Sequence, residues 1–323
     1  MKSQSTKDRI FSPINVSVLF LCILPIFLVD ASSRFLAISC LLYATLAVSW
    51  NLTLGISGIA NFAHLAFFAI GAYASAVFTS RTNLTPWFGL LIAIVVAAGC
   101  GGIAFIPILR LKGIYIALVT FVFSQICFLF VLNQSSWTGG SSGIGGLPTY
   151  YIGRISTDED GRLGLYFIVA SYFLLVIFLI DHLMKRPFGK SLIALRDNEL
   201  YAKARGIPEF RQHLIVFIIS AAMAGGAGAL YAHFLGIVSP TFFGFNYTAL
   251  VLSMVFLGGV GSLRGPIFGA VLIVIIYDKL NTQGLLRSLI VSGVVVLVIR
   301  FMPTGIAGLL GQIWSRNRRK LNQ

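Results

Sequence analysis

The sequence predicts an all-α integral membrane protein with about ten transmembrane or re-entrant helices, and three observations support this fold class. Of the 323 residues, 57% are hydrophobic and only 11% are charged. A soluble domain carries about 25% charged residues, because water must wet its surface. The mean hydropathy is +0.91, and the apolar residues form runs of roughly 20, the length that a helix needs to cross a bilayer. A soluble globular fold is therefore excluded.

Ten apolar runs are candidate spans. No polar segment between them is long enough to fold separately, so we expect a single membrane domain over residues 1–323. Two longer polar loops are predicted on opposite sides, 133–165 outside and 185–212 inside. Three of the runs are short or interrupted by Gly and Pro, and we expect incomplete crossings there: 58–79, 246–262 and 265–280. The other seven runs are 14–30, 35–54, 87–109, 113–132, 166–184, 213–236 and 285–302.

The basic residues predict which side each loop occupies. An even number of crossings places both termini on one side, and Lys and Arg concentrate in cytoplasmic segments. With the N-terminus inside, 18 of the 24 basic residues fall in inner segments, including a basic C-terminal tail at 303–323. We expect both termini to be cytoplasmic. Contact with anionic membrane lipid then explains the net charge of +14 without nucleic acid. The six outer basic residues are Arg34, Arg81, Arg154, Arg162, Lys279 and Arg287.

The sequence offers no catalytic or metal-binding constellation. It contains no GxxxxGK[ST] loop for ATP phosphates and no HExxH motif. Its four cysteines lie in apolar runs without Cys/His spacing, so we expect no metal site. Ionisable residues are nearly absent from the spans, which disfavours a carrier driven by protons or sodium. If the protein moves a solute uphill, we expect the energy to come from another subunit.

The inner loop 185–212 is predicted to contain a short, capped helix. Asp197 can act as the N-cap, with Glu199 in the first turn, where negative charge is favourable. Gly206 suits the left-handed position after the last turn. A helix of about two turns is not stable alone, and its small Ala202 would let a partner approach closely. We expect a docking element; the alternative is a basic loop that lies on anionic lipid.

The stretch GKSLIALRDNELYAKARGI (189–207) resembles the coupling loop of ABC importer permeases, in the form carried by branched-chain amino-acid permeases of the LivM type. Four further segments are similar to that family and follow in the same order: 51–73, 110–120, TGGSSGI (138–144) and LGGVGSLRGPIFGA (257–270). In that family the loop contacts an ATPase subunit. By resemblance, the coupling surface would consist of Gly189, Arg196, Asp197, Glu199, Ala202 and Gly206.

The resemblance implies the permease half of an ABC importer in a bacterial inner membrane. Such a subunit belongs to an ATP-driven, binding-protein-dependent importer of branched-chain or other small neutral amino acids. The implied partners are an H-type permease, two cytoplasmic ATPases and an extracytoplasmic binding protein. The chain itself would be no enzyme and would bind no cofactor, since ATP is used by the ATPases. The alternatives are a urea or short-amide ABC permease and, from another class, an ATP-independent channel or secondary carrier.

Polar and small residues within the spans are candidates for pathway and packing roles. Asn61 and His64 lie one turn apart on the predicted 58–79 helix and either border a pathway or join helices, the second role being favoured for His64. Glycines four residues apart permit close helix contact, and discontinuous helices often line transport sites. The candidate pathway residues are Asn51, Asn61, His64, Thr120 and Gln125. The candidate packing and discontinuity residues are Gly261, Gly265, Pro266 and Gly269.

Overall fold

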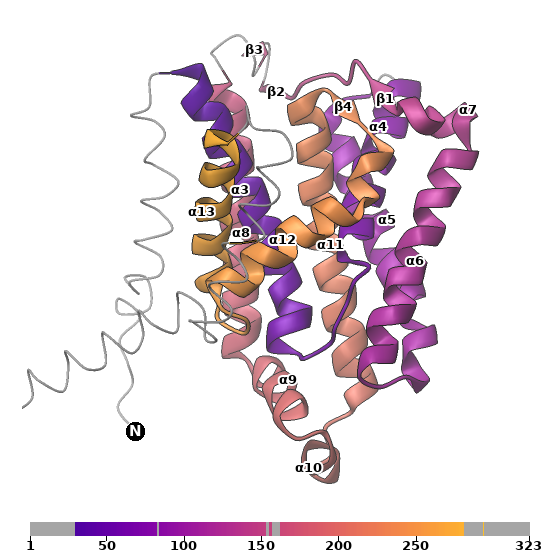
Figure 1. Cartoon of the computed structure of the whole chain (residues 1–323), viewed down its shortest axis with the longest axis vertical. Helices are drawn as coiled ribbons and strands as arrows, with labels where there is room; N and C mark the ends of the chain where they lie inside the picture. Colours follow the sequence, from indigo (N-terminus) through magenta and orange to yellow (C-terminus); the bar gives the residue numbers. More distant parts are fainter. Residues whose placement is uncertain (1–29, 83, 153–154, 157–161, 281–292, 294–323) are drawn as a thin grey trace, which may run out of the picture.

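The computed structural model describes residues 30–82, 84–152, 155–156, 162–280 and 293. Helices dominate these residues, and Figure 1 shows the long ones standing side by side as a bundle. Five of them are long and apolar enough to cross a membrane. The predicted all-α membrane fold is therefore confirmed. Apart from Asp30 and Gly293, the predicted spans 14–30 and 285–302 and the tail 303–323 lie outside the described residues.

Most predicted spans correspond to one helix each, with short elements between them. The long helices are α3 (Ala31–Asn51), α4 (His64–Thr82), α5 (Pro86–Phe105), α6 (Ile114–Asn133), α8 (Leu163–Lys185), α11 (Glu209–Leu235), α12 (Phe245–Gly258) and α13 (Gly265–Lys279). The short elements are α7 (Ser135–Thr138), α9 (Pro187–Asp197), α10 (Glu199–Ala204), a π-helix at Leu52–Ile56, and 3-10 turns at Pro107–Arg110, Gly140–Ser142 and Pro240–Phe243. Two antiparallel pairs of strands complete the set: β1 (Ile144–Gly145) with β4 (Ile237–Val238), and β2 (Tyr151–Ile152) with β3 (Ile155–Ser156).

The centre of the bundle is a crossing of α4, α5 and α11, where small residues let the helices approach closely. A Cβ atom added to Gly71 would lie 2.2 Å from the carbonyl oxygen of Gly225. On the other side, a Cβ atom on Gly225 would lie 2.3 Å from the Cβ atom of Ala97. No larger side chain fits at either contact, so α4 meets α11 backbone against backbone, and α5 meets α11 through the methyl group of Ala97.

The predicted span 58–79 is wrong at its start. The last turn of α3 widens into the π-helix 52–56, and the chain then runs irregularly through 57–63 before α4 begins at His64. Gly58 has a φ of +75°, a conformation that a side chain disfavours. Asn61 therefore lies in a turn before the helix, and not on a helix face with His64 as predicted. The hydropathy of this region hides the break, because the irregular residues are as apolar as the helices around them.

The helices α12 and α13 form a short hairpin beside α3. In Figure 1, the chain returns from β4 into the body of the bundle, and α12 runs obliquely from there. Cβ atoms on Gly265 and Gly269 would lie 2.2 and 2.0 Å from carbonyl oxygens of α12, so both glycines seat α13 against α12. Gly261 lies instead in the connecting loop, with a φ of +83°. Pro266 stands in the first turn of α13, so it begins a helix and does not interrupt one.

The predicted loop 133–165 carries local structure at the end of the bundle opposite α9 and α10. The hydroxyl of Thr138 donates to the carbonyl oxygen of Val131 at 2.6 Å. The next residues turn sharply, and a Cβ atom on Gly143 would lie 2.0 Å from the carbonyl oxygen of Val238. The TGGSSGI motif therefore forms a turn that seats β1 against β4.

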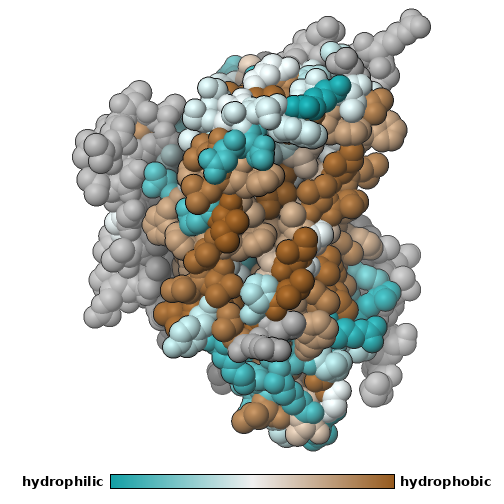
Figure 2. Space-filling model, turned by 90° about the vertical axis from the view of Figure 1, so that its right-hand side faces the viewer, coloured by the Kyte–Doolittle hydropathy of each residue, from teal (hydrophilic) through white to brown (hydrophobic). Residues whose placement is uncertain are grey.

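On the face that Figure 2 draws, apolar residues cover the middle of the bundle and hydrophilic residues lie toward both ends. α6 is the most exposed of the five candidate spans: 17% of the residues in its apolar window are buried, against 72% for α11. Lipid solvates such a surface, whereas water would not. The chain is a multi-pass membrane protein.

Candidate functional site

The end of the bundle from which α9 and α10 project, called the α9–α10 end below, carries the predicted coupling residues (Figure 1). Pro187 begins α9 directly after α8, a position in which proline costs no backbone hydrogen bond. Gly189 lets α9 fold back on α8, because a Cβ atom there would lie 2.5 Å from the Cα atom of Met184. Gly189 is buried, so it does not form part of an outer coupling surface as predicted.

The short helix α10 is capped, but not by Asp197 as predicted. The side-chain oxygen of Asn198 accepts a hydrogen bond from the backbone N–H of Tyr201 at 3.0 Å, which makes Asn198 the N-cap. Asp197 is already the last residue of α9, and its carboxylate binds Arg196 at 2.8 Å. Gly206 ends the helix with a φ of +79°. The sequence did not show that two helices, and not one, occupy this loop.

The side of α10 that faces away from the bundle is apolar. Leu200 is 77% exposed and Tyr201 is 58% exposed, whereas Ala202 is 1% exposed. The expectation that Ala202 faces a partner is therefore wrong, since α10 packs this alanine against the protein. Leu200 and Tyr201 were not among the predicted coupling residues. Two large apolar residues inside a basic loop are the signal that could have identified them.

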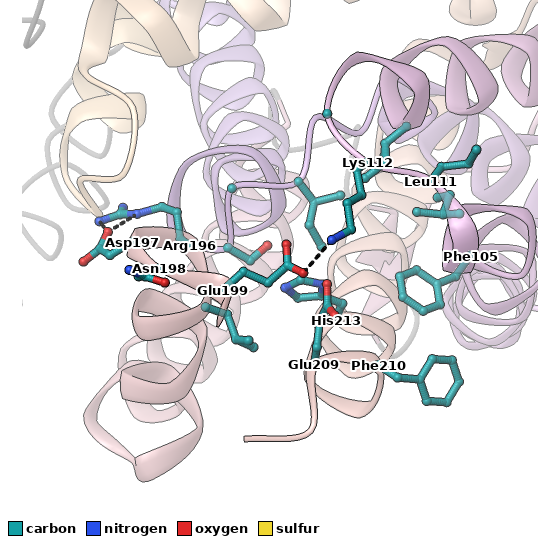
Figure 3. A pocket seen from close by; sticks show the side chains of 17 residues that line it. Phe105, Leu111, Lys112, Arg196, Asp197, Asn198, Glu199, Glu209, Phe210 and His213 are labelled. Carbon is teal, nitrogen blue, oxygen red and sulfur yellow. Dashed lines mark hydrogen bonds and ion pairs between the residues drawn. The ribbon is translucent and has the colours of Figure 1, made fainter. Parts of the chain in front are cut away.

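A charged pocket of about 290 Å³ lies between α10 and the bundle (Figure 3). Glu199 projects from α10 and accepts hydrogen bonds from Lys203 at 2.7 Å and from Lys112 at 3.0 Å. These bonds lower the pKa of the Glu199 carboxyl, Lys203 contributing more than Lys112. Lys203 also contacts the carboxylate of Glu209 at the start of α11. Through these pairs, α10 is tied to the beginnings of both α6 and α11.

Arg196 turns toward the bundle. Its Nη1 donates to the carbonyl oxygen of Gly55 at 3.0 Å, while Nε and Nη2 donate to the Asp197 carboxylate. Its side chain is 36% exposed. Arg196 was assigned to the coupling surface, but its Nη1 binds the membrane domain of the same chain.

Two of the candidate pathway residues hold irregular backbone in place. Asn51 is fully buried; its side chain donates to the carbonyl oxygen of Ser262 at 2.9 Å and accepts from the N–H of Gly261 at 2.8 Å. The hydroxyl of Thr120 accepts from the N–H of Phe62 at 3.0 Å. All three bonds join segments far apart in the chain. In this structure, neither side chain faces an open path.

His64 and Asn61 are also buried. The two imidazole nitrogens of His64 lie 3.0 Å from the hydroxyl of Ser49 and 3.3 Å from that of Ser220, so His64 joins α4 to α3 and α11. The side-chain oxygen of Asn61 accepts from the N–H of Ala63 at 2.9 Å. Gln125 is half-buried on α6. The structure therefore spreads the candidate pathway residues over several helix contacts and does not gather them into one channel.

A larger groove of about 930 Å³ lies between α4, α5 and α6, near the end opposite α9 and α10. Its lining is almost wholly apolar, with Arg81, Gln134 and Thr138 among its residues. The hydroxyl of Tyr73 is buried beside it and has no hydrogen-bond partner among the described residues. The groove includes no candidate pathway residue. Within the described part of the chain, no group of His, Cys, Asp or Glu side chains could hold a metal ion.

The sequence is similar to one protein family and to several known permeases. The sequence profile of the family described as "Branched-chain amino acid transport system / permease component" matches residues 34–300. The high-affinity branched-chain amino acid transport system permease protein LivM of Escherichia coli (strain K12) is 32% identical, over 94% of this chain and 75% of its own length. LivH of Salmonella typhimurium is 28% identical, over 82% of this chain and 91% of its own.

A probable LivM permease of Methanocaldococcus jannaschii is 25% identical, over 73% of this chain and 77% of its own length. No solved structure matches the chain significantly. The family match extends from α3 to beyond α13 and includes the coupling loop, both breaks in the bundle and the TGGSSGI turn. The chain therefore belongs to the family of permease components of branched-chain amino-acid ABC transport systems.

Proposed function

We propose that this chain is the LivM-type subunit of an ATP-driven importer of branched-chain amino acids in a bacterial inner membrane. It would act as one permease domain over residues 1–323, paired with an H-type permease. Two cytoplasmic ATPases would supply the energy, and an extracytoplasmic binding protein would deliver the substrate. The chain itself is a non-catalytic membrane subunit. The similarity to both LivM and LivH relatives supports this set of partners.

The observation that carries the docking part of the proposal is the apolar tip of α10. Leu200 and Tyr201 are the two most exposed large apolar side chains of the loop 185–212, which projects beyond the spans (Figure 1). Water solvates such side chains poorly, and apolar anchors ringed by polar residues are typical of protein interfaces. We assign this tip to the ATPase contact. The contact would therefore depend on Leu200 and Tyr201 more than on Ala202 or Gly189.

The side on which the tip lies follows from charge. The α9–α10 end carries the exposed residues Lys112, Lys185, Lys190 and Arg205, and basic residues of this kind mark the cytoplasmic face of a membrane protein. The ATPases hydrolyse ATP in the cytoplasm, so the tip and its partner would meet on the same side. The predicted outer loop 133–165 would then face the binding protein.

The test is uptake of labelled leucine by cells that carry wild-type protein or the Leu200→Ser variant, before and after ATP depletion. We expect uptake to depend on the gene and on ATP. Leu200→Ser should reduce uptake at least about tenfold, because loss of a hot-spot anchor in an interface costs about 2 kcal/mol or more. The variant should remain in the membrane, and the ATPase should no longer copurify with it.

Leu84→Ser is the matched control, since Leu84 is also exposed but lies between α4 and α5 at the opposite end. This variant should retain both uptake and ATPase binding. Gene-dependent uptake that survives ATP depletion would contradict the importer and indicate a channel or carrier. Uptake of urea in place of leucine would keep the mechanism and contradict the substrate.

A further inference from the structure

Arg196 joins the coupling loop to two irregular segments of the membrane domain. From the end of α9, its guanidinium reaches the carbonyl oxygen of Gly55 at 3.0 Å, at the end of the π-helix that follows α3. A Cβ atom on Gly261 would lie 3.2 Å from the same Nη1 atom, so the loop before α13 is adjacent. One side chain thus meets the break after α3 and the break before α13.

Two glycines, Gly58 and Gly261, lie against the side chain of Arg196. A Cβ atom on Gly58 would lie 2.7 Å from Cγ of Arg196, and Gly58 has a φ of +75°. Gly261 has a φ of +83°. At both positions a side chain would strain the backbone and would also crowd the arginine. Neither glycine is explained by helix packing, because both stand outside the helices.

Asn51 extends the connection into the body of the bundle. Its side chain binds the N–H of Gly261 and the carbonyl oxygen of Ser262, at 2.8 and 2.9 Å. It is also close to Gly55, where a Cβ atom would lie 2.1 Å from its side-chain oxygen. A continuous chain of contacts therefore runs from α9 through Arg196 to α3 and to the start of α13.

The acceptor at Gly55 exists because the helix changes its pitch there. In a π-helix the carbonyl groups bond to the fifth following residue, so the turn at 52–56 and the residues after it leave the regular α-helical pattern. The N–H of Ser57 bonds to the carbonyl oxygen of Leu52, and the carbonyl oxygen of Gly55 is left to accept from Arg196. Such widened turns are frequent at functional sites.

We infer that Arg196 is a positioning residue that transmits displacement of α9 to the breaks at 52–58 and 259–264. This inference rests on the proposed function and refines it. The family resemblance placed Arg196 on the surface that meets the ATPase, whereas its Nη1 donates to the membrane domain and its Nε and Nη2 donate to the neighbouring Asp197. The apolar tip of α10 receives the movement, and Arg196 passes it to the two segments where the helices are interrupted. A segment of irregular backbone can rearrange more readily than a packed helix.

The test uses the assembled complex in proteoliposomes, with the chain as wild type, Arg196→Met, Arg196→Lys or Arg211→Met. Arg196→Met keeps an unbranched side chain, with the Cγ atom that contacts Gly58, but removes every donor. We expect the ATP hydrolysed per leucine imported to rise about tenfold, the factor associated with a hydrogen bond from a charged donor. Arg196→Lys keeps the positive charge and a terminal donor group. It should therefore need less ATP per leucine than Arg196→Met. Arg211, exposed at the start of α11, supplies the matched control and should behave as wild type.

A second readout separates transmission from simple stability. Hydrogen exchange at 259–264 should change in the wild-type complex when a non-hydrolysable ATP analogue is added, and this change should disappear in Arg196→Met. Normal coupling together with a normal exchange response in Arg196→Met would overturn the inference and leave the proposed function intact. Wild-type uptake that needs no ATP would instead overturn the proposed function. If Arg196→Met does not assemble, the same two measurements are made on Arg196→Lys. A wild-type ratio of ATP to leucine together with a wild-type exchange response in Arg196→Lys would then also overturn the inference.

Discussion

The centre of the bundle and its α9–α10 end are held together by different means. At the centre, α4, α5 and α11 meet through glycine and alanine, and backbone contacts leave no room for side chains. At the α9–α10 end, side chains of Asn51, Thr120 and Arg196 bind the irregular backbone of other segments. Packed backbones cannot shift without separating the helices. Hydrogen bonds to irregular backbone can exchange partners at smaller cost. The difference indicates a rigid centre and a changeable end.

This division suits a subunit that receives energy from outside. A displacement of α10 first reaches the α9–α10 end, where regular α-helix is interrupted at 52–63 and at 259–264. The rigid crossing at the centre then gives those segments a fixed frame against which to move. Coupling between distant sites requires an element with two arrangements, and the broken segments are the best placed candidates.

The largest expected effect comes from filling the central crossing with Gly71→Ala. The new Cβ atom would lie 2.2 to 2.6 Å from three backbone atoms of Gly225, none of which can turn aside. We expect the free energy of unfolding to fall by about 3 kcal/mol, the upper range for overpacking. Thermal unfolding of the purified protein measures the loss.

Gly99→Ala is the control for this prediction. Gly99 also stands inside a membrane helix, α5, but no atom lies within 4 Å of the added Cβ. Its unfolding free energy should change by less than about 1 kcal/mol, the size of the helix-propensity difference. Equal losses in the two variants would show that the central crossing is not tightly packed.

An intermediate effect is expected at the α9–α10 end from Asn51→Leu. Leucine has the same number of side-chain heavy atoms and the same branching, but it leaves the N–H of Gly261 and the carbonyl oxygen of Ser262 without their partner. Leaving buried backbone groups unpaired should cost about 2 kcal/mol. Faster hydrogen exchange at 259–264 would locate the loss in that loop.

Thr45→Val provides the comparison on the same helix. Thr45 is buried like Asn51, but its hydroxyl donates only to the carbonyl oxygen of Leu41, one turn away. This variant should leave exchange at 259–264 unchanged. A loss spread over the whole bundle after Asn51→Leu would contradict the separation of the two regions.

Which features were predictable depends on how far apart in the chain their causes lie. The long helices follow from local hydropathy, and the predicted run 87–109 differs from α5 by only a few residues at each end. The capping of α10 was shifted by one residue, because the preceding helix α9 extends through Asp197. The roles of Asn51 and Arg196 could not be predicted. Their partners stand 211 and 141 residues away, and no spacing within a segment indicates them.

The smallest expected effect concerns the exposed ion pair that ties α10 to α6. Lys112 and Glu199 lie 3.0 Å apart, and the Lys112 side chain is 75% exposed. Lys112→Ala should lower the free energy of unfolding at pH 7 by at most about 1 kcal/mol, because solvent screens such pairs. Lys190→Ala, which removes an exposed lysine of the neighbouring helix α9, should have a smaller effect still.

The dependence on pH sharpens this last prediction. The pKa of Glu199 is lowered in the folded protein, so its pairing contributes stability above its unfolded value of 4.5 and loses it as the pH falls through the folded value. The difference between wild type and Lys112→Ala should therefore be present at pH 7 and shrink below pH 4.5. The Gly71→Ala loss should persist at both pH values, because no titrating group takes part in that contact. Thermal unfolding of both variants at the two pH values would thus separate a contact held by charge from one held by close packing.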